Sequence, residues 1–251
     1  MSADSGVTPG ATRLDVWLVA SGQARSRHQA QGWIVTGQVR VDGVVAGRPA
    51  QLVPPDACVV VDAQPWVSRA ALKLIGALDD AELVVPARCL DVGASTGGFT
   101  QVLLSRGADV VYAVDVGHDQ MAPEVLGDQR VVRRDGLNAK DLSLADVGGV
   151  LVGLAVADVS FISLTDVLPS ILPLVAADGS ALVLVKPQFE VGRQWLGSSG
   201  VVRDEKLRRS AVDKVCEAAG RLGWRPVWRQ ASRLSGARGN VEYFVHFKQR
   251  V

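Results

Sequence analysis

The chain has 251 residues, of which 48% are apolar and 21% charged, and its 27 basic and 26 acidic residues leave a formal net charge of +1. This composition excludes wholesale disorder and fibrous repeats, and the length allows one large domain or a domain of about 180 residues with a small module. The charge is uneven: residues 1–62 hold 5 basic and 5 acidic groups, residues 63–185 hold 8 and 15, and residues 186–251 hold 14 and 6, so the net charges are 0, −7 and +8. Such a distribution fits a polyanion held at two places, and it also fits ordinary solvated charged faces.

The first predicted elements form a small α+β unit after a flexible tail over residues 1–12. Apolar residues at helical spacing predict a short amphipathic helix beginning at Arg13 and a second helix that begins at Ser26 and ends at Gly37. The alternating run Val39-Arg40-Val41 precedes Asp42-Gly43, which is a strong signal for a two-residue hairpin turn. A unit of this size supports little chemistry of its own, but it can present basic side chains from one edge.

This unit, residues 13–62, resembles the alpha-L RNA-binding module of the ribosomal protein S-four type through the string RLDVWLVASGQARSRHQAQGWIVTGQVRVDG. The arginine doublet, the glycine before the hairpin and the Asp-Gly turn recur in order. In that family such modules contact the shape and phosphates of folded RNA. The resemblance therefore implies that basic residues of this unit bind RNA, namely Arg13, Arg25, Arg27, His28 and Arg40. A capping subdomain with incidental arginines is the alternative.

The run VPPDACVVVDAQPW leads from a strand of this unit into a linker over residues 63–67. From residue 68 to 251, strand-like apolar runs alternate with helical patterns, which is typical of a doubly wound α/β sheet. Strands are predicted at Arg88–Val92, Val110–Asp115, Arg130–Arg134, Val150–Asp158, Ala181–Lys186, Trp224–Ala231 and Val241–Lys248. Helices are predicted between them, notably at Gly98–Arg106, Leu164–Leu174 and Lys206–Leu222.

The string CLDVGASTGGFTQVLL predicts a buried strand, a glycine-rich turn and a helix that starts near Gly97. Glycine lets the backbone approach a ligand closely, and the crevice at the carboxyl end of such a strand is where these sheets bind nucleotides. The spacing differs from the dinucleotide pattern GxGxxG. Asp91 precedes the turn, and Asp115 ends the next strand, where a carboxylate can accept both ribose hydroxyls of a nucleoside. The pattern favours S-adenosylmethionine over NAD, unless the two acids only form turns.

Two further strands each carry one ionisable residue at the carboxyl end, Asp158 in ADVSFISL and Lys186 in LVLVKPQFE. Both are expected to face the same crevice. A lysine at the end of a buried strand is costly unless it is paired or used in chemistry, and Asp158 offers a partner. A catalytic pair and a structural ion pair both fit this pattern.

The second unit resembles the FtsJ-like ribose methyltransferases, and with the N-terminal module the full chain resembles the haemolysin A/TlyA family of ribosomal RNA 2′-O-methyltransferases. The matching strings are SRAALKL, LDVGASTGGFT, DVGHDQ, ADVSFISL, KPQFEVG, GVVRD and GNVEYF. The resemblance implies a Rossmann-like methyltransferase sheet, S-adenosylmethionine as cofactor, and a cytidine of 30S or 50S ribosomal RNA, or of both, as target. It also implies a Lys-Asp-Lys-Glu catalytic tetrad, which falls on Lys73, Asp158, Lys186 and Glu242.

Methyl transfer to a ribose hydroxyl requires in-line positioning and help in removing a proton from a weakly acidic alcohol. By the resemblance, Lys186 is the candidate base, Asp158 orients it, Lys73 places the hydroxyl or a phosphate, and Glu242 fixes the lysines. A free lysine has a pKa of about 10.4 and is mostly protonated at neutral pH. Burial and nearby positive charges lower such a pKa and nearby carboxylates raise it, and the sequence leaves that balance open.

The resemblance also implies contacts to the cofactor. The glycine-rich turn is expected at its methionine end, the second acidic strand end at its ribose, and a later loop near its adenine. The residues concerned are Gly93, Ser95, Thr96 and Gly97 in the turn, Asp91 and Asp158 beside it, Asp115 at the ribose, and Asp135 and Asn138 near the adenine.

Three further features concern the active-site mouth and the linker. Phe161 either contacts the target base or belongs to the core. Arg233 and Arg238 depart from the common family pattern and are expected to add positive charge beside the mouth, where they would contact RNA. In the linker, Gln64 stands where the family usually has arginine, which puts any coupling through that position in doubt.

Other classes of protein are less consistent with the sequence. Cys58, Cys89 and Cys216 form no CxxC pair and lie in apolar runs, so we expect them to be buried and expect neither a disulfide scaffold nor a metal site. With no secretion signal and no apolar run near the roughly 20 residues that span a bilayer, a cytoplasmic protein is expected. The alternatives are a binding-only protein on a methyltransferase fold, an NAD-dependent enzyme and a membrane-acting haemolysin. The intact tetrad disfavours a binding-only protein, and the glycine spacing disfavours an NAD-dependent enzyme. The lack of a broad apolar helical face disfavours a membrane-acting haemolysin. The oligomeric state is open.

Overall fold

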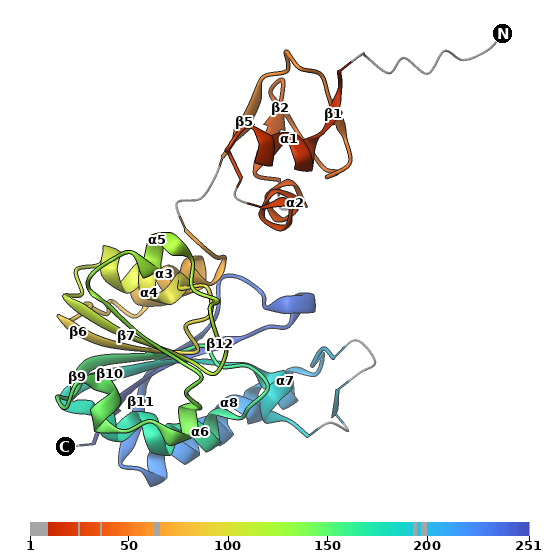
Figure 1. The fold of residues 1–251 in the computed structure, drawn as a ribbon. Helices are drawn as coiled ribbons and strands as arrows, with labels where there is room; N and C mark the ends of the chain where they lie inside the picture. Colours follow the sequence, from red (N-terminus) through yellow and green to blue (C-terminus); the bar gives the residue numbers. More distant parts are fainter. Residues whose placement is uncertain are drawn as a thin grey trace. The chain divides into compact units, whose positions relative to one another are not determined.

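The computed structural model describes residues 10–24, 26–35, 37–62, 66–192, 195–196 and 200–250. The chain divides into two compact units, Met1–Pro65 and Trp66–Val251 (Figure 1). The boundary between them falls inside the segment 63–67 that the sequence suggests as a linker.

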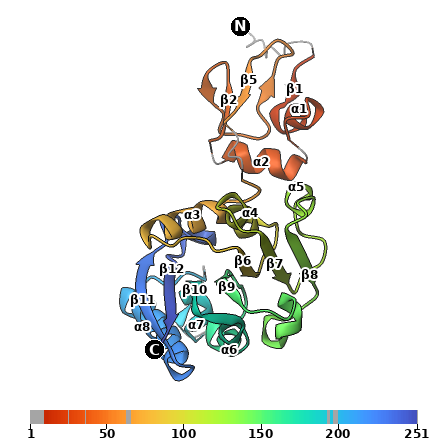
Figure 2. The same cartoon turned by 90° about the vertical axis from the view of Figure 1, so that its left-hand side faces the viewer.

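The first unit packs two short helices against small antiparallel sheets (Figure 2). Its helices are α1 (Leu14–Ala20) and α2 (Arg27–Val35), and its strands are β1 (Thr12–Arg13), β2 (Val39–Val41), β3 (Val44–Val45), β4 (Leu52–Val53) and β5 (Val59–Val61). Strand β2 lies between β3 and β5, while β1 pairs with β4. The predicted hairpin is confirmed: Asp42 and Gly43 both have positive φ, 51° and 80°, as a type I′ turn requires.

The second unit contains a seven-stranded sheet with the order β11-β12-β10-β9-β6-β7-β8 (Figure 2). Strands β6 to β10 are parallel, and β12 runs antiparallel between β10 and β11. The strands are β6 (Arg88–Val92), β7 (Val110–Asp115), β8 (Val131–Asp135), β9 (Val152–Ala157), β10 (Val175–Val185), β11 (Trp224–Ala231) and β12 (Tyr243–Gln249). The doubly wound α/β fold expected from the sequence is confirmed.

Helices cover both faces of this sheet, α3 and α4 on one side and α6 and α8 on the other (Figure 1). The α-helices are α3 (Ala70–Asp80), α4 (Gly98–Ser105), α5 (Pro123–Leu126), α6 (Leu164–Ile171), α7 (Pro187–Glu190) and α8 (Glu205–Arg221). The 3₁₀ turns are η1 (Ala139–Asp141), η2 (Leu144–Val147), η3 (Leu172–Leu174) and η5 (Ala237–Gly239). Because side chains alternate along a strand, Cys89 packs toward α3 and α4, whereas Leu90 packs on the opposite face.

Several boundaries differ from the predicted ones. Helix α6 ends at Ile171 and continues as a 3₁₀ turn, because Pro173 cannot donate the next helical hydrogen bond. Helix α8 begins at Glu205 because the Asp204 side chain caps it by accepting from the Lys206 amide. Strand β10 begins six residues earlier than expected, since Val175 already pairs with β9. Helix α3 was not among the predicted helices.

The expectation of three buried cysteines is wrong for Cys58. Cys89 is buried and Cys216 is partly buried, but Cys58 is exposed. Cys58 immediately precedes Val59, the buried first residue of β5, and neighbouring side chains of an extended segment point to opposite faces.

Across the part of the chain that the structure describes, no helix has both the length and the apolarity to cross a membrane.

The sheet topology fixes the position of a crevice. From β6 the chain proceeds outward through β7 and β8, then returns to place β9 and β10 on the other side of β6. Ligands of open parallel sheets bind at such a switch point, outside the carboxyl ends of the strands. Here that point lies between Gly93, which follows β6, and Asp158, which follows β9.

Candidate active site

A hollow of about 400 Å³ lies at the carboxyl ends of β6, β7 and β9, within the size range of small-molecule sites. Its walls combine apolar side chains with a few polar groups, which suits a nucleoside ligand. The apolar wall includes Val92, Val114, Leu137 and Ile162, and the polar groups include Ser95, Asp115, Gln120, Asn138 and Asp158.

The glycine-rich turn is required by close packing of chain segments. Gly93 has φ +84°, and an added Cβ would lie 2.5 Å from the backbone oxygen of Asp158. Gly98, the first residue of α4, meets Ser68 in the same way, because an added Cβ would collide with its Oγ. The turn therefore joins the segments that follow β6, follow β9 and precede α3.

Asp115 is held in place by backbone amides at the edge of the hollow. Its Oδ2 accepts from the Ser95 amide at 2.8 Å, and its Oδ1 accepts from the Gly117 amide at 2.7 Å. Ser95 Oγ in turn lies 3.0 Å from Oε1 of Gln120, which also lines the hollow. These contacts fix the carboxylate where the resemblance expects a ribose.

Asp91 is fully buried and does not line this hollow. Strand alternation turns its side chain toward α4, where Oδ2 accepts a hydrogen bond from Thr100 Oγ1 at 2.6 Å. Burial raises the pKa of Asp91 to about 7, and the neighbouring carboxylates of Asp158 and Asp115 add to the rise. Asp91 thus holds β6 to α4 beneath the turn rather than facing a ligand directly.

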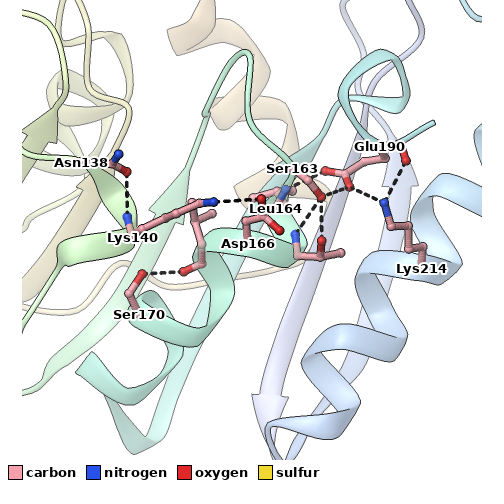
Figure 3. A network of polar contacts seen from close by, with 10 residues as sticks. Asn138, Lys140, Ser163, Leu164, Asp166, Ser170, Glu190 and Lys214 are labelled. Atoms are coloured by element: carbon pink, nitrogen blue, oxygen red, sulfur yellow. Dashed lines mark hydrogen bonds and ion pairs between the residues drawn. The ribbon is translucent and has the colours of Figure 1, made fainter. Parts of the chain in front are cut away.

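Of the other candidate cofactor residues, some line a hollow and the others lie behind its lining. Asn138 lines the hollow, and its Oδ1 accepts from the Lys140 amide (Figure 3). Thr96 lines a neighbouring hollow. Gly97 precedes α4 with φ +90° and lines neither. Asp135 also lines neither hollow, because its Oδ2 accepts from the Asp119 amide at 2.8 Å and lies 3.2 Å from an Arg133 guanidinium nitrogen.

The neighbouring hollow, of about 330 Å³, contains the candidate base. It shares Gly93, Ser95, Asp158 and Ser160 with the first hollow, so the two adjoin. Lys186 lines it together with residues that precede and begin α3, namely Ser68, Arg69 and Ala70. One hollow can thus hold a cofactor while the other receives an acceptor.

The four tetrad candidates form two ion pairs. Lys186 Nζ lies 2.7 Å from Asp158 Oδ1 and also donates to Ser160 Oγ at 2.7 Å. Lys73 Nζ donates to Glu242 Oε2 at 2.7 Å. The four side chains are between 3% and 16% exposed, so each pair is largely shielded from water. Lys73 lies one helical turn along α3 from Ala70, a lining residue of the second hollow.

The loop before β12 is built around Glu242. Gly236 passes against its carboxylate, because an added Cβ would collide with Oε1. Asn240 secures the same loop: its Oδ1 accepts from the Val202 amide and its Nδ2 donates to the Gly200 carbonyl. The loop can therefore hold a buried carboxylate against Lys73.

Phe161 is not a core residue. Its side chain is 93% exposed, and its φ of +64° is rare for a bulky residue. Its ring lies 5.3 Å, centroid to centroid, from the ring of Phe189, which follows Lys186 by three residues. The core alternative for Phe161 is therefore wrong: Phe161 is exposed, packs against the partly buried Phe189 and lines the first hollow.

Three of the candidate RNA-binding arginines of the first unit form ion pairs with aspartates. Arg13 and Arg27 both contact the buried Asp15, at 3.0 and 2.9 Å, while their side chains stay 45% and 56% exposed. Arg40 pairs with Asp62 at 3.0 Å, and His28 is exposed. The predictions for Arg25 and Gln64 lie outside the described residues.

Arg233 differs from its expected place beside the mouth. Its guanidinium pairs with Asp80, the last residue of α3, seven positions beyond Lys73. Its side chain runs over Gly76, where an added Cβ would lie 2.8 Å from Arg233 Cδ. Arg238 is exposed and has φ +58°. Arg233 thus has a carboxylate partner, whereas Arg238 takes part in no ion pair found among the described residues.

Residues 66–249 match the FtsJ-like methyltransferase family, and residues 12–57 match the S4 domain. The chain belongs to the FtsJ-like methyltransferase family. It is 49% identical to the 16S/23S rRNA (cytidine-2′-O)-methyltransferase TlyA of Mycobacterium tuberculosis over 237 residues, 93% of this chain and 88% of the relative. It is 38% identical to Hemolysin A of Brachyspira hyodysenteriae, over 94% of this chain and 99% of the relative. A solved structure described as a hemolysin from Streptococcus thermophilus superposes with a TM-score of 0.76 at 33% identity, covering 96% of this chain and 89% of that one. The resemblance inferred from the sequence is thereby confirmed.

Sequence reasoning missed several residues at this FtsJ-like site. Ser160 bonds Lys186, Gln120 lines the first hollow, and Arg69 lines the second. Each stands inside a string used for the resemblance, or next to one, at a strand or helix end. That position was a usable signal, because side chains at the carboxyl ends of neighbouring parallel strands meet.

Proposed function

We propose that the protein transfers a methyl group from S-adenosylmethionine to the 2′-hydroxyl of a cytidine in ribosomal RNA. The observation that carries the proposal is the pair of adjoining hollows, one bordered by Asp115 and the other by the Lys186–Asp158 pair. The named activity of the Mycobacterium tuberculosis relative supports the substrate class. Ribosomal RNA of the 30S or 50S subunit, or of both, is the proposed partner, which would place the protein in the cytoplasm.

The residues of the first hollow fit S-adenosylmethionine. Gly93 allows the turn to pass against the backbone oxygen of Asp158, where any side chain would collide, and Asp115 offers acceptor oxygens at the edge. Leu137 and Ile162 give an apolar wall suited to an adenine, next to Asn138. Ser95 and Thr96 lie near the place proposed for the methionine end, where Ser95 is held by Asp115 and Gln120. When bound, this cofactor supplies an electrophilic methyl group.

The chain's own residues would then position the acceptor and accept its proton. Asp158 and Ser160 hold the Lys186 nitrogen from two sides, which fixes its direction in the second hollow. In the proposed step Lys186 Nζ, having first released one of its own protons to solvent, takes the proton of the ribose hydroxyl as the new oxygen–carbon bond forms and the bond between the methyl carbon and the cofactor sulfur breaks. Shielding from water limits competing hydration of the amine, and the fixed geometry supplies much of the rate by positioning.

The second ion pair is proposed to place the acceptor. Lys73 Nζ donates to Glu242, which fixes the direction of the Lys73 ammonium group. An ammonium group can bind a phosphate or the acceptor oxygen. Among the described residues, Glu242 forms an ion pair with Lys73 and none with Lys186, so the role proposed for Glu242 narrows to one lysine.

RNA binding is proposed for three regions. In the first unit, Asp15 holds Arg13 and Arg27 in a fixed arrangement suited to phosphates. Beside the hollows, the exposed ring of Phe161 is available to stack on a base. Arg238 adds a charge that phosphate can approach.

The test is transfer of labelled methyl groups to purified unmodified 30S and 50S subunits, with the product mapped by resistance of the modified position to alkaline cleavage. A ribose-methylated cytidine in either subunit is expected. Isothermal titration with S-adenosylmethionine and with NAD runs in parallel, and binding of the first alone is expected. Binding of S-adenosylmethionine without transfer to either subunit would contradict the proposal and favour a binding-only protein. Lysis of membranes without transfer would favour the haemolysin interpretation.

A further inference from the structure

The side chain of Glu190 is a buried carboxylate near the active site that the proposed reaction does not use. Glu190 ends α7, four residues after Lys186, and its side chain is 1% exposed. Burial of a carboxylate is costly unless hydrogen bonds and charges offset it. Figure 3 shows how these are supplied.

Four contacts surround Glu190. Its Oε2 accepts from Ser163 Oγ at 2.5 Å, and its Oε1 accepts from the Leu164 amide at 2.7 Å (Figure 3). Lys214 of α8 donates to the Glu190 backbone oxygen at 2.9 Å and lies 3.8 Å from Oε2. Burial raises the pKa of Glu190 while these hydrogen bonds oppose the rise. The carboxylate thus caps the first turn of α6 from a different element.

These contacts form the second of two links between the segments that follow β9 and β10. The segment 158–163 follows β9, and the segment 186–190 follows β10. At one end, Lys186 binds Asp158 and Ser160, and at the other end Glu190 binds Ser163 and Leu164. Between the two attachments, the rings of Phe161 and Phe189 lie against each other. Both ends of the intervening loop are thus held, and within it Phe161 has a positive φ.

The same helix also supports the cofactor hollow. Asp166 of α6 pairs with Lys140 at 3.0 Å, and Ser170 Oγ donates to the Ala139 carbonyl at 2.5 Å (Figure 3). Ala139 and its neighbour Asn138 line the first hollow. The carboxylate that holds the start of α6 is therefore linked, through that helix, to residues that line the first hollow.

We propose that Glu190 is a positioning residue for methyl transfer: its carboxylate fastens the loop 158–163 to α7 and so sets the Lys186–Asp158–Ser160 geometry and the place of Phe161. The inference rests on the proposed function, since its kinetic consequence requires that reaction. The inference depends on the length of the Glu190 side chain, because its carboxylate must contact Ser163 and Leu164 at the same time.

Two substitutions at Glu190 separate the effect of side-chain length from the effect of charge. Glu190→Gln keeps the length and an acceptor for the Leu164 amide but loses the charge. Glu190→Asp keeps the charge but shortens the side chain by one methylene, so that it no longer reaches both partners. We expect kcat to fall at least about tenfold in Glu190→Asp, since small misplacements of reacting groups have large effects, and to stay within about threefold in Glu190→Gln.

The matched control is Ser180→Ala. Ser180 lies in β10 as well, is 3% exposed and bonds His246 at 3.0 Å, away from the hollows. Its loss is expected to lower the Tm while kcat stays within about twofold of wild type. Affinity for S-adenosylmethionine is expected to change less than about threefold in all three variants. Equal kcat in Glu190→Asp and wild type, or a loss in Glu190→Gln larger than in Glu190→Asp, would overturn the inference.

A second measurement does not depend on the reaction. The Leu164 amide donates to Glu190, so its hydrogen exchange reports the attachment itself. Faster exchange at residues 159–164 in Glu190→Asp, with β9 unchanged, is expected. Unchanged exchange there would overturn the inference even if wild type methylates ribosomal RNA. Altered exchange in a protein whose wild type transfers no methyl group would instead reject the proposed function and retain the attachment.

Discussion

Replacement of Asp91 by asparagine is expected to change how the stability of the protein depends on pH. The Asp91 carboxyl is fully buried, and burial raises its pKa to about 7. An aspartate in an unfolded chain has a pKa of about 3.9. Between about pH 4 and pH 7 the folded state therefore retains a proton that the unfolded chain has already released. The stability that this proton contributes is complete below about pH 4 and is lost as the pH rises through about 7.

The size of the effect follows from the two pKa values. A difference of about 3 units corresponds to about 4 kcal/mol of unfolding free energy, lost at about 1.4 kcal/mol per pH unit between pH 4 and pH 7. Asparagine has no proton to lose in this range and can still accept from Thr100 Oγ1. Relative to wild type, Asp91→Asn should therefore gain about 2–3 kcal/mol of stability between pH 5 and pH 8.

Urea unfolding followed by tryptophan fluorescence at pH 5, 6, 7 and 8 measures this difference. The first unit contributes the same transition to both proteins, so its share cancels in the comparison. Thr100→Val is the matched control: it removes the hydrogen bond that favours the charged carboxylate, so the wild-type slope should persist to higher pH. Parallel stability curves for wild type and Asp91→Asn would refute the reasoning, because they would mean that Asp91 titrates normally.

Three further changes have expected outcomes. Glu242→Gln leaves the 12%-exposed Lys73 side chain without its charge partner, so urea unfolding should show a loss of about 3 kcal/mol, and replacement of both residues by apolar ones should recover most of it without recovering activity. Asp15→Asn frees the two arginines that it holds, so RNA affinity measured from 50 to 200 mM salt should fall, with a shallower salt dependence; an unchanged slope would contradict the proposed phosphate contacts. Phe161→Ala should leave the Tm unchanged because the ring is 93% exposed, while kcat/KM for ribosomal subunits falls about 5- to 100-fold; a lower Tm with unchanged kcat/KM would argue for a structural role.

The sheet was predictable because its strands are short apolar runs separated by turn signals. Strands β6 and β7 have the bounds expected from the sequence, since buried parallel strands are apolar on both faces. The antiparallel return of β12 between β10 and β11 was not expected, because strand order depends on long-range pairing that leaves no local pattern.

The site was predictable where residues stand at strand ends and not where contacts join distant segments. Asp158 and Lys186 end neighbouring strands, and their ion pair follows from that. The Lys73–Glu242 contact spans 169 positions and was reached only through resemblance. Asp91 shows the opposite case: strand position suggested a ligand contact, but side-chain alternation turns its carboxyl into the core.

The most direct test of the proposed chemistry is single-turnover methyl transfer by Lys186→Ala, measured together with its affinity for S-adenosylmethionine. Lys206→Ala, which removes an exposed lysine of the same unit, is the control. We expect Lys186→Ala to bind the cofactor within about threefold of wild type and to lose at least about a hundredfold in the rate of ribose methylation, in line with loss of a general base. Methylation of the same ribose at the wild-type rate would contradict the assignment of Lys186 as proton acceptor.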